Sequence, residues 1–294
     1  MTARLAVFWE RLWFVPASPL GLLAARTLLA AQALWVVLSR PDLPELAGWP
    51  REFWRFVDPA LRLRFGIAEA TASAEPLLFL MLHGTLVATL LGVAPRLATL
   101  LSAALLYHFA PFEELLVGMP YTSFGGLTLP TAGLFVLAFA VTPRWRSDPS
   151  PEYRWPLALL QVLFSFNYLF PGLLKLRYSG LGWFTGPAIE GFLVANDFVT
   201  RAPWALWIAG QPALCWAIAL GTLGLELGFP LAVVSRRAAL VLVPLAVAFH
   251  LGIIWSLGYF FPSLPLLLLF VDWDRLDARL RGASSRGREP APLG

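Results

Sequence analysis

A single lysine stands out among the basic residues of this chain. The sequence contains 22 Lys and Arg residues, and Lys175 is the only lysine among them. Arginine stays protonated in proteins, whereas a lysine removed from water can lose its proton and act as a base or nucleophile. Because arginine would supply a fixed charge equally well, Lys175 is the first candidate for base chemistry. The alternative is a structural lysine that only anchors a helix end.

Two further ionisable residues lie in the middle of apolar segments. Glu226 lies in the sequence LGLELGFP, and His250 lies in AFHL. A charged side chain inside a membrane costs roughly 3 kcal/mol, so such residues are rare and are candidates for function. On neighbouring antiparallel helices the two side chains can meet, and we expect a buried pair that either supports Lys175 or has a purely structural role.

The remaining polar residues in apolar segments have structural explanations. Arg26 can snorkel to the interface, and His83 and Asn167 can form hydrogen bonds between helices. His108 can belong to an interfacial polar cluster. The three histidines are widely spaced, and neither a phosphate-binding loop nor a hydrolase motif is present. The single cysteine, Cys215, excludes an internal disulfide. The sequence therefore predicts no metal site.

The composition is that of a membrane protein. Hydrophobic residues make up 58% of the chain and charged residues 14%, whereas soluble domains have about a quarter of their residues charged. The long apolar runs lack the alternation of barrel strands, which predicts an all-α bundle of transmembrane helices. The net charge of +4 comes from arginines that flank these runs. That distribution indicates membrane topology and argues against a nucleic-acid partner.

The candidate residues lie on three of about eight predicted spans. Lys175 lies on the fifth, Glu226 on the sixth and His250 on the seventh. The spans are expected near 18–38, 76–93, 97–112, 127–141, 156–176, 212–234, 238–257 and 259–271.

The regions outside the spans define three parts of the chain. Residues 1–17 predict an interfacial N-terminal helix, residues 18–273 the transmembrane domain, and residues 274–294 a disordered basic tail. The aromatic and charged segment 39–75 predicts a second interfacial helix.

The distribution of arginines predicts the orientation of the spans. With an inside N-terminus, the short inside loops carry the arginines, and the short outside loops 113–126 and 257–259 carry none. Both termini are then cytoplasmic. Lys175 lies at the outer end of its span, with His250 about 10 Å and Glu226 about 20 Å below the outer surface at ~1.5 Å per residue.

Several segments together resemble a known superfamily. The motifs are YLFPGLLKL at 168–176, WFTGPA at 183–188, Glu226 before Phe229-Pro230, and FHL at 249–251 followed by YFFP at 259–262. In this order they resemble the vitamin K-dependent gamma-carboxylase superfamily, whose membrane part is the horizontally transferred transmembrane (HTTM) domain. The resemblance covers roughly residues 5–275 and is to the short bacterial form without a soluble domain.

The resemblance implies a function for Lys175. In the carboxylases, the lysine of the matching Gly-x-x-Lys-Leu segment is the base that deprotonates reduced vitamin K. Oxygenation of the quinol then yields a strong base that removes a glutamate γ-proton before carbon dioxide adds. The implied cofactor is a reduced quinone, and the implied location is a bacterial inner membrane.

Two departures from the family pattern leave the activity open. The carboxylases have an Asn-His pair before the fourth span, whereas this chain has YTSFGG at 121–126, without histidine. The chain also lacks the soluble domain that holds the peptide substrate. The alternative is a non-catalytic membrane protein that assists maturation of a secreted peptide or confers immunity, with the bilayer itself as the other partner.

The eight-span topology makes a direct prediction. Reporter fusions at Gly294 and within 113–126 should report opposite sides of the membrane, because an odd number of predicted spans separates them. Both reporters on the same side would contradict the eight-span arrangement.

Overall fold

The structure, a computed structural model, describes residues 2–46, 72–116, 126–185, 187–202 and 204–286. Within these ranges the chain is helical, and its only strand-like feature is an isolated bridge between Ala17 and Ser150. The elements are α1 (Thr2–Trp13), α2 (Pro19–Leu38), α3 (Leu43–Leu46), η2 (Ala72–Ala74), α5 (Glu75–Leu91), α6 (Pro95–Leu116), α7 (Thr128–Phe139), η4 (Pro151–Tyr153), α8 (Arg154–Ser179), α9 (Gly182–Thr185), α10 (Ala188–Thr200), α11 (Ala205–Ala209), α12 (Pro212–Gly228), α13 (Leu231–Val234), α14 (Arg236–Leu257), η5 (Leu264–Phe270) and α15 (Trp273–Arg286).

Six of the first seven predicted spans each coincide with one described helix, and the sixth span is divided between two. Three segments are long and apolar enough to cross a membrane: Pro19–Leu38, Pro151–Ser179 and Arg236–Leu257. Shorter apolar helices cover Glu75–Leu91, Thr128–Phe139 and Pro212–Gly228. The all-helical class is therefore confirmed, together with helices that can span a bilayer.

Two predicted spans differ in form from the expectation. The span expected over 259–271 contains only a seven-residue 3₁₀ helix, η5, which rises about 14 Å at ~2.0 Å per residue. Pro262 and Pro265 lack the N–H that a continuous α-helix requires. For the same reason Pro230 divides the span expected over 212–234 into α12 and α13.

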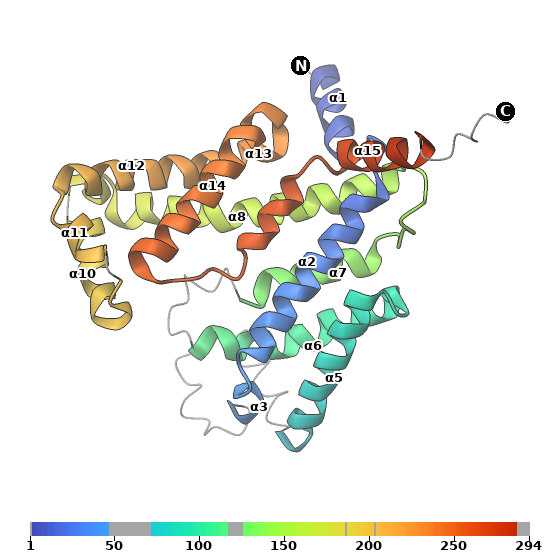
Figure 1. The fold of residues 1–294 in the computed structure, drawn as a ribbon, viewed down its shortest axis with the longest axis horizontal. Coiled ribbons are helices and arrows are strands. Elements are labelled where there is room, and N and C mark those ends of the chain that lie inside the picture. Colours follow the sequence, from blue (N-terminus) through green and yellow to red (C-terminus); the bar gives the residue numbers. More distant parts are fainter. Residues whose placement is uncertain (1, 47–71, 117–125, 186, 203, 287–294) are drawn as a thin grey trace, which may run out of the picture.

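Helix α2 lies at the centre of the bundle, between α7 and the segment that contains η5 (Figure 1). Ala25, Leu29, Ala30 and Ala33 on this helix are fully buried. Small side chains let neighbouring helices approach closely, which in a membrane replaces the hydrophobic effect as the source of packing energy. On α7, Gly133 packs against the side chain of Leu29.

Helices α8 and α12 form a second, antiparallel contact on the other side of the bundle (Figure 1). The ring of Phe229 lies 6.0 Å from Phe164 and 4.1 Å from Tyr168. Beyond the end of α8, the first turns of α12 pack with α10, α11 and the end of α14 around a small apolar cluster that includes Cys215 and Leu257. This arrangement sets the level at which residues of α8 and α12 meet.

The prediction of a disordered tail over 274–294 is wrong for its first half. Helix α15 covers Trp273–Arg286 and lies beside the start of α2 (Figure 1). The Ser18 backbone N–H donates to Asp274 at 2.6 Å, and the Ser18 hydroxyl donates to Asp277 at 2.9 Å. Arg281 adds a bond to the carbonyl of Ser147 at 2.8 Å. These partners are remote in sequence, which is why the composition alone suggested disorder.

Within the segment 1–17, Thr2–Trp13 form helix α1, whose residues Leu5, Phe8 and Trp9 are exposed, and its place at the membrane interface stays a prediction. The interfacial helix expected within 39–75 falls mostly on residues 47–71, which lie outside the described residues, as do residues 287–294 of the tail.

Close packing at Gly133 predicts a specific sensitivity to added volume. A Cβ there would lie 2.7 Å from one Leu29 methyl carbon and 3.1 Å from one of Leu160. We expect Gly133→Ala to destabilise the protein by about 1–3 kcal/mol through overpacking, measured as a lower thermal midpoint in detergent. Gly84→Ala is the matched control, because a Cβ at Gly84 meets nothing within 4 Å. Equal effects of the two substitutions would contradict this packing.

Candidate functional site

The lysine singled out by the sequence forms an ion pair inside the bundle. Lys175 on α8 donates from Nζ to Glu226 Oε1 on α12 at 2.6 Å. The Glu226 side chain is 8% exposed and that of Lys175 is 21% exposed. A carboxylate buried this deeply needs a charged partner, and Lys175 supplies it while its side chain stays partly accessible.

Local backbone features bring the two helices together at this point. Gly172 faces α12, where an added Cβ would lie 3.0 Å from Glu226 Cβ and 3.1 Å from Leu227. Pro171 lies inside α8, so the carbonyl of Asn167, four residues earlier, has no helical N–H partner. Because Gly172 has no side chain, α8 and α12 can approach each other closely at this point.

A second polar pair lies about two turns earlier on α8. The Tyr168 hydroxyl and His250 Nε2 on α14 are 2.9 Å apart, and both side chains are buried. The Tyr168 ring stacks on Phe229 with an interplanar angle of 18°. Phe229 follows Glu226 by one turn of the chain. The stacking of its ring on Tyr168 therefore links the Tyr168–His250 pair to the Lys175–Glu226 pair through packing.

The pairing differs from the one expected. Glu226 and His250 both face the interior, with 6% and 7% exposure, as the cost of exposing them to lipid requires. Each bonds to a residue of α8, and no direct hydrogen bond between Glu226 and His250 occurs among the described residues. Helix α8 supplies a hydroxyl to His250 and an ammonium to Glu226.

Lys175 lies in the last turns of α8, which ends at Ser179, and its depth in a membrane stays a prediction. Glu226 faces Gly172, one turn before Lys175, and lies about 21 Å from the start of α12 at ~1.5 Å per residue. The first turns of α12 extend beyond the end of α8, with Ala219 accepting a bond from Trp183 of α9 at 3.2 Å. Trp183 of α9, whose ring centroid is 5.2 Å from Lys175 Nζ, therefore lies beside the ion pair.

Several polar atoms around these pairs have no hydrogen-bond partner. Among the described residues, Glu226 Oε2, His250 Nδ1 and Asn167 Nδ2 are buried without a hydrogen-bond partner. Leaving such an atom unpaired costs about 1–3 kcal/mol. An aromatic wall is also present, because Lys175 Nζ lies 5.2 Å from the Trp183 ring centroid. The cluster thus combines a cation, an acceptor, an imidazole and an indole.

The other polar residues of the spans lie in different surroundings. His83 Nδ1 contacts the Phe79 carbonyl of its own helix at 2.8 Å, so it is not the interhelical bridge that was expected. His108 pairs with the fully buried Glu75 of α5 at 2.8 Å. Arg26 lies on α2 near the turn between α5 and α6, where a Cβ on Gly92 would lie 3.4 Å from its guanidinium. None of these contacts belongs to the Lys175 cluster.

Sequence reasoning quoted Tyr168 only as part of a motif and gave it no role. A signal was available, because Tyr168 and Lys175 are seven residues apart and therefore lie on the same face of a helix. The stretch 121–126, where the family has a histidine, falls mostly on residues outside the described ranges. Within those ranges no group of three or more His, Cys, Asp or Glu residues has the arrangement of a metal site.

Three comparisons with known proteins found no match for this chain. No family model matches the chain, no curated protein matches it, and no solved structure matches it.

The ion pair predicts a hierarchy of stabilities. Lys175→Met leaves Glu226 buried without its cation and should destabilise the protein by about 3 kcal/mol. Glu226→Ala should cost more than Glu226→Gln, because the amide oxygen still accepts a bond from Lys175. Thermal unfolding in detergent measures these differences.

The double variant Lys175→Met with Glu226→Gln tests the coupling between the two residues. Its loss of unfolding free energy should be smaller than the sum of the losses in the two single variants, because no buried charge remains. Strict additivity would show that the two residues do not interact in the folded protein.

Proposed function

We propose that this chain is an HTTM-type membrane protein that binds a lipophilic quinol and removes a proton from it with Lys175. The observation that carries the proposal is the buried contact between the only lysine and Glu226 at 2.6 Å, beside the indole of Trp183. The resemblance of segments 168–176 and 183–188 to the carboxylase superfamily supports the same choice of base.

The residues present fit a flat aromatic ring with polar oxygens. Trp183 offers a face for stacking, and Glu226 Oε2 and His250 Nδ1 offer bonds to hydroxyl or carbonyl groups. Surfaces that bury a ring and fix it with a few polar groups are typical of small-molecule sites. A quinol bound there would supply the reducing equivalents of the reaction.

The pairing defines how Lys175 can work as a base. A base must be neutral before it accepts a proton. Transfer of one proton from Nζ to Glu226 Oε1 leaves a neutral amine and a neutral carboxylic acid. The amine can then take the proton of the substrate hydroxyl, which leaves the substrate as its conjugate base. Glu226 is thus the group that holds the displaced proton, and the surrounding apolar helices exclude water.

The proposal includes an orientation in a bacterial inner membrane with both termini in the cytoplasm. Support comes from the arginines at one end of the bundle, where Arg154 donates to the Leu12 carbonyl at 3.0 Å and Arg236 pairs with Asp272. Figure 1 places α1 and α15 together at this end. Trp255, about 28 Å further along α14 at ~1.5 Å per residue, lies 5.0 Å from Trp204. Tryptophans favour the membrane interface.

The substitution Lys175→Arg tests the base. Arginine preserves the charge opposite Glu226 but cannot give up its proton. We expect the variant to fold and insert normally and to lose the reaction with reduced menaquinone by about a hundredfold or more. The measurement is quinol consumption in air by the purified protein, corrected for spontaneous oxidation, with mass spectrometry of the lipid extract to detect bound quinone.

Arg177→Gln is the matched control, because Arg177 is exposed and lies in the same last turns of α8. It should retain full activity. Full activity in Lys175→Arg would reduce Lys175 to a structural anchor. Absence of both turnover and bound quinone in the wild type would favour the non-catalytic role in peptide maturation or immunity.

A further inference from the structure

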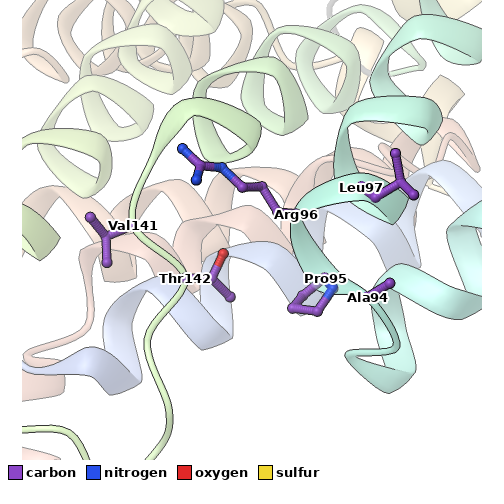
Figure 2. Close-up of a pocket in the computed structure, with 6 residues that line it drawn as sticks. All are labelled: Ala94, Pro95, Arg96, Leu97, Val141 and Thr142. Atoms are coloured by element: carbon purple, nitrogen blue, oxygen red, sulfur yellow. The ribbon is translucent and has the colours of Figure 1, made fainter.

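A surface pocket lies at the turn between α5 and α6, away from the Lys175 cluster. Its volume is about 530 Å³, and it is lined by Ala94, Pro95, Arg96, Leu97, Val141 and Thr142. Figure 2 shows the Arg96 side chain extending from the start of α6 toward the segment that carries Val141 and Thr142. The walls are mainly apolar, and Arg96 supplies the positive charge.

A second arginine reaches the same place from α2. Arg26 lines a small cavity of about 20 Å³ with Thr99 and Thr142, among other residues. This cavity shares Val141 and Thr142 with the larger pocket. The guanidinium of Arg26 also lies against Gly92, where an added Cβ would be 3.4 Å from it. Arg96 in the pocket and Arg26 in the small cavity beside it therefore lie on the two sides of the segment that carries Val141 and Thr142.

Neither arginine has an acidic partner in the part of the chain that the structure describes. The ion pairs of the described residues do not include Arg26 or Arg96. Arg26 Nε is buried and makes no hydrogen bond. The other arginines at this end are used differently, since Arg154 and Arg281 bond to backbone carbonyls. An arginine left unpaired at the side of a bundle has its donors available to an external anion.

We infer that this pocket binds the phosphate headgroup of an anionic phospholipid. Arg26 and Arg96 would hold the phosphate, Thr142 offers a hydroxyl, and exposed Leu97 and Val141 face the first methylenes of the acyl chains. Basic pockets between transmembrane helices are suited to anionic headgroups, because the charge is met at the interface while the chains stay in the hydrocarbon.

The apolar part of the lining favours a lipid over free phosphate. Leu97 is 58% exposed and Val141 is 44% exposed, and a free phosphate would gain nothing from these side chains. A phospholipid contacts the arginines with its headgroup and the apolar side chains with its acyl chains. The pocket thus defines a headgroup site independent of the chemistry proposed at Lys175.

Native mass spectrometry of the full-length protein in mild detergent tests this site. Single-lipid complexes are titrated with phosphatidylglycerol and, separately, with zwitterionic phosphatidylcholine. We expect phosphatidylglycerol to bind more tightly, and Arg96→Gln and Arg26→Gln each to weaken it by about fivefold. Arg96 is exposed, so its substitution tests the site even if Arg26→Gln perturbs folding.

Arg237→Gln is the control, because it removes the same charge from an exposed arginine outside the pocket. It should leave phosphatidylglycerol binding unchanged. An equal loss in Arg237→Gln would show diffuse attraction and overturn the site, as would unchanged binding in Arg96→Gln. Displacement of the lipid by inorganic phosphate would identify a soluble-anion site and also overturn the inference.

Discussion

The interior of this bundle depends on the pairing of charges and polar groups away from water. The contact between Lys175 and Glu226 at 2.6 Å is the clearest case, because neither residue is stable alone in that position. It ties α8 to α12, and the bond from Tyr168 to His250 at 2.9 Å ties α8 to α14. Helix α8 is therefore bonded to two others, and the apolar packing of Phe229 and Phe164 fills the space between its polar contacts.

Charged groups at the arginine-rich end of the bundle are paired in a different way. There the arginines bond to backbone carbonyls or pair with carboxylates. Arg281 does both, with the Ser147 carbonyl and with Asp277. These contacts attach α15 to the start of α2 and close one end of the bundle. Arg26 and Arg96 are exceptions at this end, and their lack of a partner among the described residues is what distinguishes the phospholipid pocket from its surroundings.

The two sites occupy different environments and call for different ligands. The Lys175 cluster joins α8 to α12 beside Trp183 of α9 and contains buried polar atoms without a partner among the described residues. The pocket at Arg96 is open at the surface and presents unpaired donors. A neutral ring with hydroxyl groups suits the first, and an anion suits the second. Their separation means that loss of one function leaves the other measurable.

Hydropathy was sufficient to determine the all-helical class and the location of the longer apolar helices. Apolar runs of this length must form helices in lipid whatever their neighbours, and the rarity of buried charges identified Lys175, Glu226 and His250. Which of them meet was decided by the tertiary structure. The level of α12 against α8 depends on the intervening segment 180–211 and on the close approach at Gly172, so a count of residues from each span end did not identify Lys175 as the partner of Glu226. The order of α15 likewise depends on Ser18 and Ser147, more than a hundred residues away, and local composition carries no information about such distant partners.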